Sequence, residues 1–158
     1  MMRFAGTSYV AARPREVFAV VGDPKRLAEW LNNIDEVVDD RAERGVEEGP
    51  GAFRFTARLE DAPVQVEGRT SVWGPQHRVG FEFNSEVGHW ELDYMIRPAG
   101  ETTRLDVILV ATRSSWLKAL FLRTRARHAR QEFAAALARL RDVIEVGVAR
   151  GSEGSTPH

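Results

Sequence analysis

Apolar and polar residues alternate through the middle of the chain, which is the pattern of half-buried β-strands. The alternation first appears over residues 52–59 and returns over residues 64–72, 79–83, 90–96 and 105–111. Glycines and prolines separate these segments by short connections. We therefore expect successive strands to pair antiparallel and to form one sheet.

The beginning of the chain predicts one strand followed by two short helices. Residues 3–11 mix apolar and small side chains without a helical period, which indicates a strand. Pro14 and Pro24 each suit the first turn of a helix, because the N–H that proline lacks has no partner there. Asp23 is placed to cap the second helix, and a weak strand is expected over residues 34–41.

A helical period replaces the alternation near the end of the chain and predicts one long helix over residues 115–148. Its main apolar stripe consists of Leu122, Ala126, Ala129, Phe133, Leu137, Leu140 and Ile144. A second apolar group near residues 117–121 means that the helix either bends near residue 122 or carries two patches. The polar residues 149–158 predict a disordered tail, which leaves a single domain over residues 1–148.

Composition narrows the class of protein. The 158 residues carry a formal net charge of -1, so no overall positive field favours nucleic acid. The chain has no cysteine, which excludes disulfides, thiolate metal sites and a cysteine nucleophile, and fits a reducing compartment. No apolar run approaches the length of a membrane span. We therefore predict a cytoplasmic protein with no nucleic-acid partner.

The order of elements and three local motifs resemble the START/Bet v 1-like (SRPBCC) superfamily. The motifs are Pro-Arg-Glu-Val-Phe at residues 14–18, Asp23-Pro24 followed by Trp30, and Gly-Pro-Gly at residues 49–51. The chain is most similar to the bacterial polyketide cyclase/dehydrase and lipid-transport group, over about residues 3–146. The resemblance implies an α+β helix-grip fold, in which a curved antiparallel sheet of about seven strands wraps around a long C-terminal helix.

Members of this superfamily bind lipids, sterols, hormones or polyketides in a cavity between the sheet and the last helix. Some members catalyse cyclisation or dehydration in that cavity. The resemblance therefore implies a cavity wall, and it assigns no particular chemistry to any residue of this chain.

The alternation also shows which side chains face the helix, because only the apolar face of such a sheet can be covered. Thr70 and Tyr94 are polar residues on that face, which carries no Asp, Glu, His or Lys from a strand centre. Acid–base catalysis needs a titratable group near the substrate, so we identify no catalytic constellation. The candidate ligand-binding residues are Trp30, Phe53, Phe55, Thr70, Phe81, Phe83, Trp90, Leu92, Tyr94, Leu109, Ala126, Ala129 and Phe133.

These aromatic side chains fit two interpretations. They are able to fill a solid core, because protein interiors are close-packed. Alanines at Ala119, Ala126, Ala129 and Ala136 of the last helix favour a hollow instead, and so does the family resemblance. In a hollow, Thr70 and Tyr94 would orient a ligand.

The last helix is rich in basic residues. They are Lys118, Arg123, Arg125, Arg127, Arg130, Arg139 and Arg141. A solvated helix face explains this charge. The alternatives are a peripheral membrane contact through the segment from Trp116 to Arg130, a phosphate-bearing ligand or an acidic partner. The four histidines show no helical metal spacing, so we predict neither a metal nor a cofactor.

The sequence thus predicts binding of a hydrophobic small molecule, either a lipid or an aromatic polyketide-like compound. One alternative is a cyclase or dehydrase that uses the same cavity. Another is a protein-interaction module whose cavity is filled. Whether the protein is a monomer or a dimer stays open.

Overall fold

The computed structural model describes residues 2–32, 34–39, 51–59, 62–86, 88–112 and 129–154. Within these residues, a seven-stranded sheet has the order β1-β7-β6-β5-β4-β3-β2, and all neighbouring strands are antiparallel. The strands are β1 (Met2–Val10), β2 (Val38–Asp39), β3 (Ala52–Leu59), β4 (Ala62–Gly74), β5 (Arg78–Ser85), β6 (Gly88–Ala99) and β7 (Thr102–Ala111). The helices are α1 (Pro14–Val21), the 3₁₀ helix η1 (Pro24–Glu29) and α4 (Ala129–Gly154).

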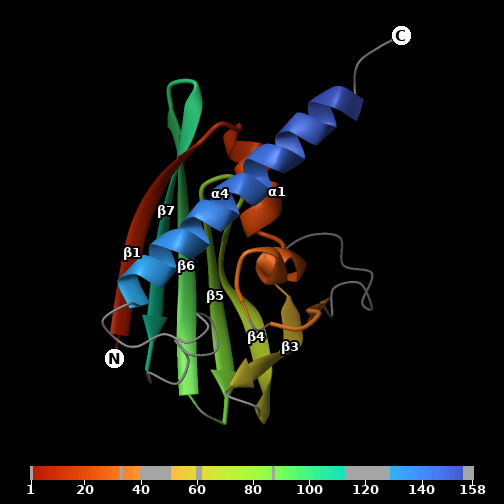
Figure 1. Cartoon of the computed structure of the whole chain (residues 1–158), viewed down its shortest axis with the longest axis vertical. Coiled ribbons are helices and arrows are strands. Elements are labelled where there is room, and N and C mark those ends of the chain that lie inside the picture. Colours follow the sequence, from red (N-terminus) through yellow and green to blue (C-terminus); the bar gives the residue numbers. More distant parts are fainter. Residues whose placement is uncertain are drawn as a thin grey trace.

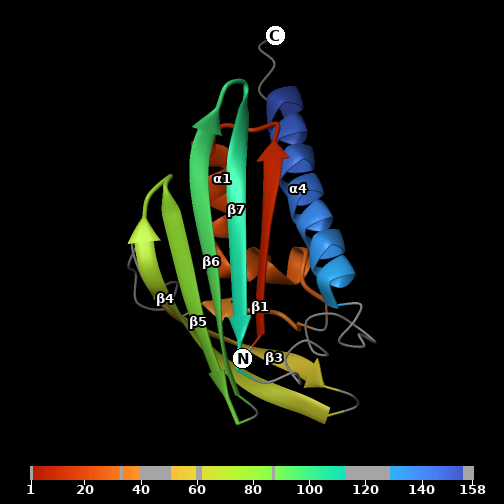
Figure 2. The same ribbon diagram turned by 90° about the vertical axis from the view of Figure 1, so that its left-hand side faces the viewer.

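The helices lie on one face of the curved sheet, and α4 crosses that face obliquely (Figures 1 and 2). This arrangement confirms the predicted α+β helix-grip fold. Among the described residues, none of the helices combines the length and the apolar character that crossing a membrane requires.

The two short helices begin where the prolines predict. Pro14 opens α1, and the Glu16 carboxylate accepts a hydrogen bond from the Arg13 backbone N–H at 2.9 Å. The Asp23 side chain accepts from the Lys25 backbone N–H at 3.0 Å and thereby caps η1, as expected. The second helix is a 3₁₀ helix and not an α-helix.

Alternate residues of the strands point toward the helices, as the sequence pattern predicts. In β6 the buried positions are Trp90, Leu92, Tyr94 and Ile96, and the residues between them are partly exposed. Each buried residue faces a buried residue across the ladder to β7, for example Leu92 opposite Leu109. The apolar face of the sheet is therefore continuous from strand to strand.

Helix α4 packs mainly against β1 and also touches α1 and η1. Its buried residues are Phe133, Ala136, Leu137, Leu140 and Ile144. Gly6 of β1 lets the helix approach closely, because a Cβ there would overlap the Leu137 side chain. The described part of the predicted apolar stripe thus holds α4 against the first strand.

Two predicted boundaries are wrong. Residues 149–154, assigned to a disordered tail, are helical, because α4 continues to Gly154. Single glycines cost a helix only about 1 kcal/mol each relative to alanine, so neither Gly147 nor Gly151 ends it. Of the strand expected over residues 34–41, the described residues 34–39 form a bridge between Ile34 and Ala57 and the two-residue β2. Residues 115–128 of the predicted helix lie outside the described residues.

Candidate functional site

Seven of the predicted ligand-binding residues form one aromatic cluster on the helix-facing side of the sheet. Phe83 lies at its centre and stacks on Trp90, with ring centroids 3.6 Å apart and planes at 8°. The rings of Phe53, Phe55 and Phe81 meet Phe83 at centroid distances between 5.6 and 6.2 Å. The cluster consists of Trp30, Phe53, Phe55, Phe81, Phe83, Trp90 and Tyr94.

Trp30 brings η1 into this cluster. It is the C-cap residue of η1, and its ring meets the Tyr94 ring at a centroid distance of 6.4 Å. Its backbone carbonyl accepts a hydrogen bond from Arg139 Nε of α4 at 3.1 Å. Trp30 therefore connects the sheet, the second short helix and the long helix.

The hydroxyl of Tyr94 is the main polar group at the cluster. The Tyr94 side chain is 0% exposed, and its hydroxyl has no hydrogen-bond partner among the described residues. Burial raises the pKa of this hydroxyl well above its ordinary value. The group is therefore a neutral phenol at physiological pH, with a proton available for donation.

Arg139 is a second polar group beside the cluster, and the sequence pattern indicates it only as one of the basic residues of the last helix. Its Nη2 atom is buried and has no hydrogen-bond partner in the part of the chain that the structure describes. Arg139 flanks the buried residues Ala136 and Leu140 on α4. This position beside the apolar stripe of α4 is the sequence feature that indicates a partly buried arginine.

The other predicted site residues are distributed around the cluster. Leu92 and Leu109 are buried opposite each other, and the partly buried Thr70 lies opposite Phe81. Phe133 meets Phe4, with centroids 5.7 Å apart, on the β1 side of the sheet. Ala126 lies outside the described residues, and of Ala129 only the backbone is described.

Two open grooves flank α4 in the described part of the chain. One, of about 600 Å³, runs between β1 and α4 and includes Arg3, Phe133 and Leu137. The other, of about 580 Å³, lies between α1 and the end of α4. Phe133 is the one predicted site residue among the residues that line them. An enclosed hollow against the aromatic cluster remains a prediction.

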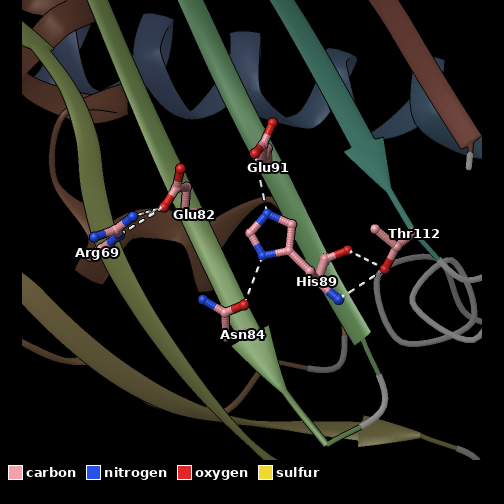
Figure 3. Close-up of polar contacts among 6 residues, drawn as sticks. All are labelled: Arg69, Glu82, Asn84, His89, Glu91 and Thr112. Carbon is pink, nitrogen blue, oxygen red and sulfur yellow. Dashed lines mark hydrogen bonds and ion pairs between the residues drawn. The ribbon is translucent and has the colours of Figure 1, made fainter.

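The opposite face of the sheet carries a polar network, shown in Figure 3 with the helices behind the strands. The His89 ring bonds to Asn84 Oδ1 through Nδ1 at 2.8 Å and to Glu91 Oε1 through Nε2 at 3.2 Å. Glu82 pairs with Arg69 on the same face. The His89 ring thus bonds across to β5 through Nδ1 and along its own strand β6 through Nε2, on an uncovered surface, which is a structural role.

Across the residues that the structure describes, no three His, Asp or Glu side chains are grouped so that they could hold a metal ion.

The sequence profile of the "Polyketide cyclase / dehydrase and lipid transport" family matches residues 1–145. The chain belongs to this family. No curated protein matches the sequence. The family name covers both enzymes and carriers, so it fits the aromatic face described above without choosing between the two.

Solved structures of other proteins share the fold. TTHA0849 from Thermus thermophilus has a TM-score of 0.66 at 18% identity, covering 92% of this chain and 99% of its own. The di-domain ARO/CYC StfQ from the steffimycin biosynthetic pathway has a TM-score of 0.64 at 15% identity, covering 93% and 51%. The Aha1 dimer from Colwellia psychrerythraea has a TM-score of 0.57 at 14% identity, covering 93% and 98%. At these identities the likeness concerns the fold alone.

Proposed function

We propose that this protein binds an apolar small molecule, a lipid or an aromatic polyketide-like compound, against the aromatic cluster. The observation that carries the proposal is the buried Tyr94 hydroxyl without a partner among the described residues. The Tyr94 hydroxyl would donate a hydrogen bond to a ligand oxygen, because it has no acceptor among the described residues. The candidate residues of the sheet face and Phe133 would contact the rest of the ligand.

The energetics favour this interpretation of Tyr94. A buried donor that lacks a partner costs about 1–3 kcal/mol of stability. A phenylalanine at position 94 would fill the same space without that cost, so the hydroxyl is better explained by binding than by packing. Covering apolar area contributes about 25 cal/mol per Å², before the cost of ordering the ligand.

A cyclase or dehydrase that uses the same face is the second candidate. The observation that favours it is again Tyr94, because burial keeps its hydroxyl protonated and able to donate to a substrate carbonyl. The described strand residues on this face include no carboxylate, imidazole or amine that could act as its base. We therefore place binding first and turnover second.

A cytoplasmic location is part of the proposal.

Native mass spectrometry tests the proposal with the purified protein and a panel of fatty acids, sterols and fused-ring aromatics. We expect a one-to-one complex with at least one class. Tyr94→Phe should weaken that complex by about two- to tenfold, as one hydrogen bond contributes roughly 0.5–1.5 kcal/mol. Tyr9→Phe is the matched control, because Tyr9 is 53% exposed on β1.

The same experiment separates the alternatives. No ligand carried from the expression host and none taken up from the panel would contradict the proposal. Oligomers without ligand would support the protein-interaction alternative. Conversion of a bound polyketide-like compound would support the enzyme.

A further inference from the structure

The guanidinium of Arg139 reaches from α4 toward the aromatic cluster. Its Nε donates to the carbonyl of Trp30 at 3.1 Å, and the ring of Trp30 meets the ring of Tyr94. Trp30 thus contacts both residues, Arg139 of the helix through its carbonyl and Tyr94 of the sheet through its ring.

The two groups have the same unmet need. Arg139 Nη2 and the Tyr94 hydroxyl are both buried, and neither has a hydrogen-bond partner among the described residues. An arginine has only donors, and a neutral phenol has one donor. Each atom therefore lacks an acceptor.

The ion pairs among the described residues do not include Arg139. On α4, Glu145 accepts from Arg141 and from the Ala11 backbone N–H. On η1, Glu29 pairs with Arg26. A buried nitrogen of a charged group that lacks an acceptor is costly, and an anion supplies both the acceptor and the counter-charge.

We propose that the ligand carries a carboxylate, which accepts from Arg139 Nη2 while the Tyr94 hydroxyl donates to an oxygen at the same end. This inference rests on the proposed function and specifies its ligand class. Fatty acids and aromatic acids satisfy both donors. Sterols and neutral lipids offer a hydroxyl or ester oxygen but no charge, and they leave the guanidinium without a counter-ion.

Matched probe pairs test the inference in the full-length protein. One pair is palmitate and hexadecanol, and the other is anthracene-2-carboxylate and 2-anthracenemethanol. Each pair keeps the apolar body and changes only the charged end, so the two pairs separate an aliphatic from an aromatic source of the carboxylate. We expect the acid of the preferred pair to bind at least tenfold more tightly than its alcohol, which corresponds to about 1.4 kcal/mol.

Arg139→Met should remove this preference for the acid and change the affinity for the alcohol by less than about twofold, since it keeps most of the apolar length. Arg139→Lys keeps the charge and should retain part of the preference. The control is Arg150→Met, the same substitution at an exposed position near the end of α4, which should leave both affinities unchanged.

The outcomes distinguish the inference from the proposed function. Equal affinity of wild-type protein for acid and alcohol would overturn the inference and leave the proposed function standing. An unchanged preference in Arg139→Met would also overturn it. Failure of all four probes to bind would count against both. The wild-type ratio decides the matter even if Arg139→Met does not fold.

Discussion

The two faces of the sheet are built from alternate residues of the same strands, yet they are held together differently. On the helix-facing side, Phe83 stacks on Trp90 within a cluster of rings. On the other side, Glu82 lies opposite Glu91, and these two carboxylates pair with Arg69 and His89 respectively (Figure 3). Like charges directly opposite each other destabilise a sheet, so the pairs mainly offset that repulsion.

This difference indicates where stability and function reside. Removal of one ring from a close-packed cluster greatly lowers the free energy of unfolding. Exposed ion pairs contribute only about 0–1 kcal/mol each to that free energy. The two buried donor atoms without described partners, the Tyr94 hydroxyl and Arg139 Nη2 of α4, are on the helix-facing side as well. We therefore expect the helix-facing side to govern both folding and binding, and the other face to have small effects.

The largest effect should come from Phe83→Ala. Removal of a buried aromatic ring typically costs about 3–5 kcal/mol of the free energy of unfolding. The control is Glu82→Ala, one residue away on the other face, where the change should stay within about 1 kcal/mol. Urea unfolding of both variants measures the difference. Equal losses of unfolding free energy in the two variants would contradict the proposed difference between the two faces.

An intermediate effect is expected at Gly68, which lies opposite both Phe53 and Phe83. A Cβ at this position would overlap the Phe53 ring. Gly68→Ala should therefore destabilise the protein by about 1–3 kcal/mol, the usual cost of overpacking. Thermal or urea unfolding measures this loss.

Gly147→Ala is the matched control for Gly68→Ala. Position 147 is in α4 and has nothing within 4 Å of an added Cβ. The same substitution there should stabilise the protein by about 0.5–1 kcal/mol, because alanine is the better helix former. If Gly68→Ala stabilised the protein instead, the aromatic face would have unfilled space next to Gly68.

The smallest effect concerns Glu145, whose pKa is lowered mainly by the hydrogen bond from the Ala11 backbone N–H and then by Arg141. A pKa below the ordinary value of 4.5 means that the ionised form stabilises the fold above pH 4.5. This contribution is lost as the pH falls through the lowered pKa. Because Glu145 is partly exposed to solvent, Glu145→Gln should cost less than about 1 kcal/mol at pH 7.

Urea unfolding at pH 7 and at about pH 3 checks this prediction. The gap between wild type and Glu145→Gln should shrink at the lower pH. A gap that is the same at both values would show that the carboxylate charge is not involved.

The fold was largely predictable because its signals are local. Alternation places Leu92 and Tyr94 on the covered face, and Pro14 and Asp23 mark where the short helices begin. The end of α4 was not predictable in this way, because a polar composition is typical of disorder, whereas helix propagation tolerates Gly147 and Gly151. Hydrophobic periodicity indicates which residues are buried, but it is a poor guide to where a helix ends.

The candidate site was predictable only in part. The sequence pattern correctly placed Phe81, Phe83 and Tyr94 on one face, since strand parity decides it. It did not indicate the buried end of Arg139, because that depends on how α4 meets the carbonyl of Trp30 more than a hundred residues earlier. Contacts between distant elements lie outside what a local pattern can show.

The central claim is that Tyr94 keeps its hydroxyl for a ligand and not for the fold. The free energy of unfolding of Tyr94→Phe, measured against wild type without ligand, tests this claim most directly. We predict that the variant is more stable by about 1 kcal/mol or more, because a buried hydroxyl without a partner is removed. A variant less stable than wild type would contradict the account, because the hydroxyl would then be supporting the folded protein.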